Sequence, residues 1–177
     1  MSLTRNDVIQ IIETARQQGD IPDLRRLNLH QVDLTGLDLS RANLSFADLR
    51  AAKLNRVNFE EANLTGVDLR QADLSQANLK NAKLLGADLA KARLGGANLL
   101  EASLRNANLS DADLRSAILI ESSMRGAGLV VATLYEADLN GANLIRADLR
   151  GAKVTDEQLN QAKSLKGAIM PNGSIHP

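Results

Sequence analysis

An apolar residue, nearly always leucine, recurs at every fifth position from Leu24 to Val154 without a change of phase. We call these positions centres. Of the 27 consecutive centres, 24 are leucine, and the exceptions are Phe59, Met124 and Val154. An α-helix requires a period of about 3.6 residues and a β-strand a period of about 2, so neither element explains a strict period of five. This stretch must therefore adopt a third periodic geometry.

The residue two before each centre is usually alanine and the residue just before it is usually Asp or Asn, as in Ala42-Asn43-Leu44. Units too short to bury an apolar face alone must stack on one another. We expect the centre and the alanine to point inward and the other three positions to face water. Four units would close a square coil, and about seven coils stacked at ~4.8 Å would form a rod roughly 30 Å long.

Glycine falls two residues after a centre at seven places, which predicts corners whose backbone has a positive φ. These places are positions 36, 66, 86, 96, 126, 141 and 151.

Three segments follow from the extent of the repeat. Residues 1–21 are predicted to form an N-terminal capping helix, with Thr4 and Asp7 in the arrangement of a capping box. Residues 22–154 are the repeat. Residues 155–177 are predicted to form a C-terminal capping helix and tail, because Thr155 and Gln158 give a second capping box. Helices at both ends would cover the raw edges of a solenoid, and the alternative is that they bind a partner.

The tandem motif A(D/N)LXX resembles the repeat of the pentapeptide repeat family over about 133 of the 177 residues. The resemblance implies an all-β solenoid, a right-handed quadrilateral β-helix, here with short α-helical caps at both ends. The run from Ala162 to Ala168, followed by Pro171-Asn172-Gly173, is similar to the tails of cyanobacterial members. Family members with known biochemistry act by binding: some mimic DNA and shield type II topoisomerases, and others regulate cell differentiation through protein contacts.

The sequence offers little catalytic chemistry. It lacks cysteine, its two histidines lie far apart at positions 30 and 176, and no glycine-rich phosphate loop precedes a helix. We therefore expect no enzymatic activity, no metal and no cofactor. No apolar run approaches the roughly 18 residues of a membrane span, and no signal segment begins the chain. We expect a cytoplasmic protein without membrane contact.

The formal net charge is zero, from 21 acidic and 21 basic residues. This balance disfavours both a general attraction for nucleic acid and the strong acidity of a DNA mimic. Sorting residues by every twentieth position nevertheless separates the charges onto faces. The basic face, with centres from Leu24 to Leu144, nets +5, and the acidic face, with centres from Leu39 to Leu139, nets −4. On the face with centres from Leu34 to Val154, which we call the ladder face, the residues just before the first five centres alternate in sign, so neighbours in adjacent coils are expected to pair. The remaining mixed face is nearly neutral.

Two features depart from a uniform solvated surface. Arginines 105 and 125 would stack directly on a stretch without acids, which is costly unless an anion or an acidic partner lies there. The motif also degrades between residues 117 and 135, where apolar residues occupy outward positions. The candidate interaction surface therefore comprises Lys83, Arg105, Arg125, Arg146, Leu100, Ile118, Ile120, Val130, Val131 and Tyr135.

The sequence thus predicts a non-enzymatic scaffold that binds an unknown protein on its flat faces, as a monomer or weak homodimer. One alternative is a DNA-mimicking protein that binds gyrase, which the zero net charge disfavours. Another is direct nucleic-acid binding through Arg105, Arg125 and Arg146.

Overall fold

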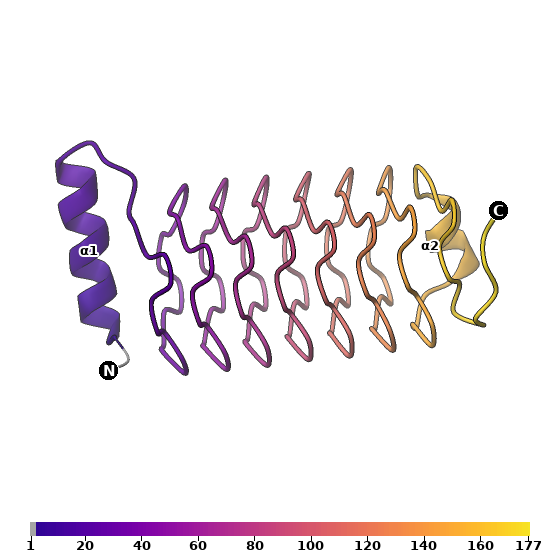
Figure 1. Ribbon diagram of the computed structural model, residues 1–177, viewed down its shortest axis with the longest axis horizontal. Helices are drawn as coiled ribbons and strands as arrows, with labels where there is room; N and C mark the ends of the chain where they lie inside the picture. The colour runs from indigo at the N-terminus through magenta and orange to yellow at the C-terminus, as the bar shows by residue number, and fades with distance from the viewer. Residues whose placement is uncertain (1–2) are drawn as a thin grey trace.

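The computed structural model describes residues 3–177 and shows a rod of stacked four-sided coils, with one helix at its N-terminal end and a shorter one within its last coils (Figure 1). The helices are α1 (Arg5–Gln17) and α2 (Asp156–Asn160). Short parallel bridges join each residue just before a centre to its equivalent 20 residues on, from Asp23–Asn43 to Thr133–Lys153. The period of five therefore corresponds to one side of a coil, and four sides return the chain to the same face.

Backbone hydrogen bonds between coils hold each side in register. The amide of each centre donates to the carbonyl 19 residues on, as from Leu24 to Asn43 at 2.8 Å. The amide of the residue before a centre donates to a carbonyl of the preceding coil, as from Asn43 to Pro22 at 2.9 Å. Each amide that is paired in this way escapes the cost of a buried donor without an acceptor.

A β-turn closes each side. The amide three residues after a centre donates back to it, as from Val32 to Leu29 at 3.2 Å. The residue two after the centre has a positive φ at every corner from position 26 to position 151, in 19 non-glycine residues and seven glycines. A positive φ at this turn position is the mark of a type II turn. The expectation of positive φ at the corners is confirmed.

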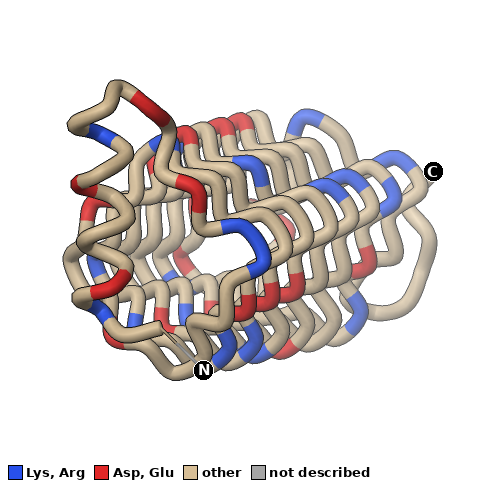
Figure 2. The backbone as a smooth tube through the Cα atoms, turned by 60° about the vertical axis from the view of Figure 1, so that its left-hand side comes forward, with Lys and Arg blue, Asp and Glu red and all other residues tan. Residues whose placement is uncertain are grey.

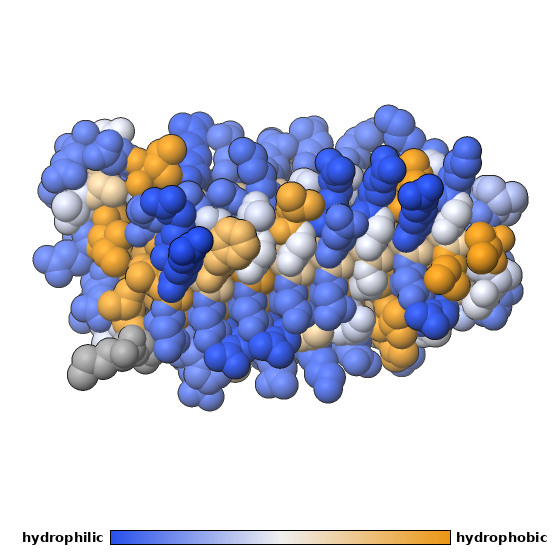
Figure 3. All heavy atoms as spheres, in the orientation of Figure 1, coloured by the Kyte–Doolittle hydropathy of each residue, from blue (hydrophilic) through white to orange (hydrophobic). Residues whose placement is uncertain are grey.

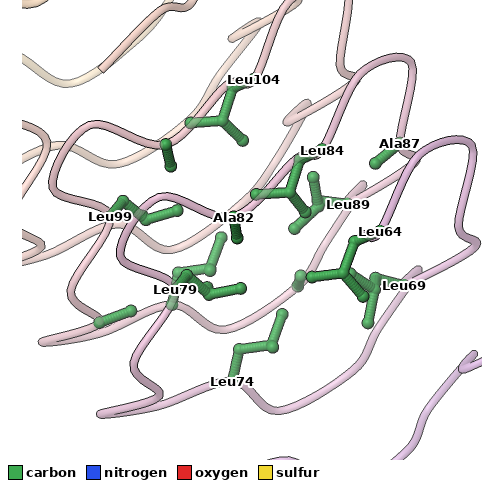
Figure 4. Packing of buried hydrophobic residues seen from close by; sticks show 14 of the residues in the cluster. Leu64, Leu69, Leu74, Leu79, Ala82, Leu84, Ala87, Leu89, Leu99 and Leu104 are labelled. Atoms are coloured by element: carbon green, nitrogen blue, oxygen red, sulfur yellow. The ribbon is translucent and has the colours of Figure 1, made fainter. Parts of the chain in front are cut away.

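The core is a column of leucines and alanines along the rod axis. Figure 4 shows Leu64, Leu84 and Leu104, which are equivalent in successive coils, with their side chains pointing into the rod. Phe59 and Met124, the two variant centres inside the repeat, are completely buried. Complete burial of such a side chain contributes roughly 1.5–3 kcal/mol, so the column of centres supplies most of the apolar stabilisation.

Corner glycines also make room for side chains from the coil before. A methyl group at Gly66 would lie 2.5 Å from the ring of Phe46, and one at Gly141 would lie 2.5 Å from the carboxylate of Glu121. At Gly86 the same space is open. Since most corners accept other residues at the same φ, contact with the preceding coil is the additional reason for glycine at positions 66 and 141.

Helix α1 covers the N-terminal end of the rod (Figure 1). Thr4 and Asp7 form the expected capping box, and Val8 and Ile12 are buried against the first coil. The first coil has no coil before it to donate to its carbonyl groups, so the N-terminal segment supplies donors. They run from the Leu3 amide to Asn28, from the Arg5 guanidinium to Asp33 and Thr35, and from the Arg16 guanidinium to Asp38, at 3.0–3.2 Å.

The sequence pattern ends the repeat at residue 154, but in the structure the coils continue past that residue. Thr155 and Gln158 form the capping box, but α2 ends at Asn160, and its buried Leu159 remains in phase with the centres. The chain then returns to the coil geometry with one extra residue, because Ser164 pairs with Asn143 and Ile169 with Asp148, each 21 residues apart. The coil geometry thus extends beyond the repeat that the sequence delimits.

The last residues fold back over this final edge. Ile175 pairs with Ile169 in the antiparallel sense, and the amide of His176 donates to Ala168 at 2.8 Å. The Pro171-Asn172-Gly173 turn that the sequence indicates makes this reversal, with a bond from the Gly173 amide to Met170 at 2.9 Å. Backbone groups that would otherwise offer an open β-edge are paired here within the chain.

Candidate interaction surface

The surface of the rod is nearly flat. One hollow, of about 780 Å³, is a shallow depression on the ladder face over Gly95 and Gly96. Within residues 3–177 no group of three or more His, Cys, Asp or Glu side chains is placed to hold a metal ion. Neither helix is long and apolar enough to cross a membrane. The candidate site is therefore a surface and is best described by its charges.

Seven arginines directly follow a centre, and they fall into two groups. In five, the residue just before the centre is Asp, and the arginine folds back across its own side to that carboxylate. The Nη2–Oδ2 distance is 2.6 Å in every case, for Asp23–Arg25, Asp48–Arg50, Asp68–Arg70, Asp113–Arg115 and Asp148–Arg150.

These Asp–Arg units neutralise themselves. In the first, the Arg25 guanidinium also donates through Nε to Oδ1 of Asp23 at 2.8 Å, and the Arg25 amide donates to the same oxygen. The side-chain hydrogen bond from Arg25 and then the backbone one lower the pKa of Asp23 to about 2. The pKa of Asp68 is lowered in the same way, first by its hydrogen bond from Arg70. An exposed pair of this kind contributes only about 0–1 kcal/mol, so its main consequence is a locally neutral surface.

Arg105 and Arg125 form the second group. Serine stands at positions 103 and 123, where the other five units have Asp. Both arginines are exposed, and no ion pair involves either within the described part of the chain. They hold equivalent places in successive coils, which stack at ~4.8 Å. The basic face therefore carries two adjacent guanidinium groups without a counter-charge.

Two further basic residues lie on the same face, outside the row of these arginines. Lys83 and Arg146 are exposed, and neither takes part in an ion pair among the residues that the structure describes. Leu85 is 44% exposed one coil before Arg105, and Ile145 is half-buried one coil after Arg125. Figure 3 shows such apolar side chains as separate spots among hydrophilic ones on this view of the rod.

The acidic face is partly neutralised at its N-terminal end. Arg16 contacts the carboxylate of Asp38 at 3.0 Å, and Arg41 contacts that of Glu61 at 3.2 Å. Glu101 and Glu121 are exposed at corners with φ of 57° and 54°, and no ion pair reaches either among residues 3–177. Charges of one sign follow one another along the rod in Figure 2.

The apolar candidates do not form one patch, because the coil distributes them over three faces. Leu100, Ile118 and Ile120 share the acidic face, where Ile118 bridges to Asn98 and is 39% exposed. Val130 and Val131 belong to the mixed face, where Val131 is 48% exposed. Tyr135, 50% exposed, lies on the ladder face.

The other faces carry ion pairs both between coils, as the ladder pattern predicts, and within single repeat units, which it does not. On the mixed face, Arg50 lies 3.6 Å from Asp68, and Arg70 lies 3.6 Å from Asp88, so one continuous row of charges crosses several coils. On the ladder face, Lys53 pairs with Asp33, and Arg93 pairs with Asp73. Asp113 pairs instead with Arg115 of its own unit. The signal for these own-unit pairs is the spacing Asp-x-Arg, which sorting by faces alone overlooks.

Comparison with known proteins agrees with this architecture. The sequence profile described as "Pentapeptide repeats (8 copies)" matches residues 23–61, 42–81, 58–96, 82–119 and 129–163. It leaves residues 120–128 unmatched, where Ser122 and Met124 replace the usual alanine and leucine. None of the curated proteins compared with the chain matches it.

Solved structures give further likenesses. HetL, a pentapeptide repeat protein involved in heterocyst differentiation regulation from the cyanobacterium Nostoc sp. strain PCC 7120, is 40% identical. The match covers 87% of this chain and 74% of HetL, with a TM-score of 0.47. A pentapeptide repeat protein from the Arabidopsis thaliana thylakoid lumen is 30% identical over 71% of this chain and 85% of its own, with a TM-score of 0.53.

QnrB1, a plasmid-mediated fluoroquinolone resistance protein, is 18% identical over 85% of this chain and 92% of its own, with a TM-score of 0.55. At that identity the likeness concerns the fold alone. The period of five, the four-sided coil and the matched profile together lead to one assignment. The chain belongs to the pentapeptide repeat family, whose members are right-handed quadrilateral β-helices.

Proposed function

We propose that the protein is a non-enzymatic scaffold that binds an acidic protein surface on its basic face. The observation that carries this proposal is the pair Arg105 and Arg125. The other five arginines in the same place of the repeat unit are closed by their own Asp, whereas these two follow Ser103 and Ser123.

Stacked guanidinium groups without a counter-charge repel one another. Two unit charges 4 Å apart interact by about 1 kcal/mol in bulk water, and by more in a less polar surrounding. A carboxylate from a partner would convert this repulsion into charge-assisted hydrogen bonds, which arginine forms well because its planar fork matches a carboxylate. Serines 103 and 123 are small, so they leave a flat floor on which a partner approaches both arginines.

The test compares two double variants with the same change in net charge. Arg105→Glu/Arg125→Glu should abolish binding of the partner recovered from extracts of the native host, and binding to wild type should weaken as salt rises. The control Arg50→Glu/Arg70→Glu alters arginines that already have Asp partners on the mixed face, and it should leave binding intact. Equal loss in both variants, or no loss in the first, would refute the proposal.

The two alternative functions, binding of duplex DNA and binding of gyrase, can be tested with the same protein. Duplex DNA should not bind in a salt titration, because the chain has no net positive charge. Added protein should also leave gyrase supercoiling unchanged, because a DNA mimic needs dense negative charge and this chain has two partly separated charge rows instead. HetL is described as taking part in heterocyst differentiation regulation, and a regulatory contact in the cytoplasm would fit a protein that acts by binding.

A further inference from the structure

We propose that the acidic surface which the basic face binds is that of a second copy of this chain. This inference rests on the proposed function. Two rods would lie side by side and parallel, with their basic faces in contact and a two-fold axis running along the interface. Arg105 and Arg125 of each copy would then pair with Glu101 and Glu121 of the other.

The two rows of unpaired charge border the same side of the rod. Glu101 is the last corner before the chain enters the basic face, with φ of 57°. Ser103 and Leu104 follow in the middle of that side, and Arg105 begins the turn that leaves it. Glu101 and Arg105 therefore occupy opposite long edges of one side in one coil, and Glu121 and Arg125 repeat this arrangement in the next coil.

The symmetry of a dimer selects the parallel arrangement. A two-fold axis parallel to the rods exchanges the two long edges but keeps each coil at its own height, so each arginine meets a glutamate. A two-fold axis across the rods keeps each edge on its own side and reverses the coils, so that arginines meet arginines. Like charges placed opposite one another in a contact are unfavourable. A two-fold contact is self-complementary, so each pair forms twice.

The spacing of the two rows agrees without adjustment, because both copies have the same coil rise of ~4.8 Å. The floor between the rows is made of small side chains at Ser103 and Ser123, which allows close approach. Lys83 is the one basic residue in the middle of this side, one coil earlier. Lys83 would face Lys83 of the other copy. Its long flexible stem lets the ammonium group turn toward Glu101 of that copy instead.

Exposed ion pairs are individually weak and are screened by salt. The dimer should therefore form at high protein concentration and low ionic strength, and dissociate as salt is added. Sedimentation equilibrium or native mass spectrometry of the full chain would measure this, and a wild-type protein that stays monomeric at low salt would overturn the inference.

Charge reversal gives the sharper test. Arg105→Glu/Arg125→Glu makes both edges acidic, and Glu101→Arg/Glu121→Arg makes both edges basic. Each variant alone should be monomeric, whereas an equimolar mixture should form heterodimers, since every edge then meets the opposite charge. A mixture that remains monomeric would refute the inference. Circular dichroism melting of both variants checks that they fold, and Arg50→Glu/Arg70→Glu should dimerise like wild type.

The absence of cysteine allows a test of direction. In the parallel dimer, Ser103 meets Ser103 and Asn43 meets Asn43, so Ser103→Cys and Asn43→Cys should each cross-link under mild oxidation. An antiparallel dimer brings at most one of these two positions opposite the same position of the other copy, so cross-linking of only one would overturn the parallel arrangement.

If the wild type is monomeric while Arg105→Glu/Arg125→Glu still abolishes binding of another protein, the self-association fails and the proposed function stands. If neither association depends on these arginines, both fail.

Discussion

Removing one buried serine hydroxyl is expected to stabilise the protein rather than to destabilise it. Ser122 occupies the inward position that Ala102 and Ala142 fill in the neighbouring coils, and it is 1% exposed. Its hydroxyl has no hydrogen-bond partner among residues 3–177. Since alanine fits the same place one coil away on either side, we expect Ser122→Ala to stabilise the protein.

The magnitude follows from the cost of burying an unpaired polar group. Mutational data place that cost at about 1–3 kcal/mol for a hydroxyl. Removing one oxygen atom also loses some van der Waals contacts, at about 0.1–0.2 kcal/mol for each atom pair. The net gain should be about 1 kcal/mol, which for a domain of this size raises the Tm by roughly 2–4 °C.

The matched control is Ser45→Ala, for which the opposite sign is expected. Ser45 is also buried, at 7% exposure, but its hydroxyl donates to the side-chain oxygen of Asn43 at 2.9 Å. Losing that bond should cost roughly 0.5–1.5 kcal/mol. Urea unfolding of both variants measures the two changes in the free energy of unfolding, with the same dependence of that free energy on urea concentration as in the wild type. If Ser122→Ala destabilises the protein as much as Ser45→Ala does, the Ser122 hydroxyl is satisfied and the reasoning is wrong.

Three further outcomes are expected. Leu89→Asp places a charge in the fully buried core and should unfold the rod or cost more than about 4 kcal/mol; near wild-type melting would mean that centres do not point inward. Gly66→Ala should destabilise more than Gly86→Ala in thermal unfolding, since both have φ of +63° but only the first meets another side chain, that of Phe46; equal losses would mean that turn strain alone matters. The pKa of Asp23 is lowered from 3.8 to about 2 in the folded protein, so its contribution to stability is present above about pH 4 and is lost as the pH falls toward 2. Asp23→Asn should therefore reduce the acid-induced decrease in the urea midpoint over that range, and an unchanged decrease would contradict the assignment.

The sequence was sufficient to predict which residues point inward, because a period of five at 27 positions determines the phase of every other residue. It placed Phe59 and Met124 in the core, and both are completely buried. It also placed positive φ at the corners. It could not explain why certain corners are glycine, because that depends on contacts such as Phe46 over Gly66 between coils.

The C-terminal end exceeded what the period could predict. Leu159 stays in phase although it belongs to α2, and Leu165 and Met170 then take the places of centres one residue out of phase. A single inserted residue ends the strict period without ending the coil. The hydrogen bonds and bridges of the backbone, which the sequence pattern does not encode directly, carry the fold across this insertion.

The charged surface was predicted by face but not by partner. Sorting by every twentieth residue suggested that charges pair between coils, as Arg93 does with Asp73. It did not anticipate that Asp-x-Arg closes within one unit, as in Asp113 and Arg115. A residue two positions away along the same side is already held in place by the backbone, so less side-chain freedom is lost in reaching it than in bridging two coils.

Because Asp-x-Arg pairs form within one repeat unit, the two arginines that lack such an Asp are the ones to which we assign a binding function. The hydrogen bonds between coils and the apolar column hold the rod together, and an exposed Asp–Arg pair adds at most about 1 kcal/mol. Serine in place of Asp at positions 103 and 123 therefore has little consequence for folding. Its consequence is electrostatic, because it leaves two neighbouring guanidinium groups on a chain whose total charge is zero. A surface whose charge is not needed for folding and is not neutralised by its own unit is where binding to a partner should be sought.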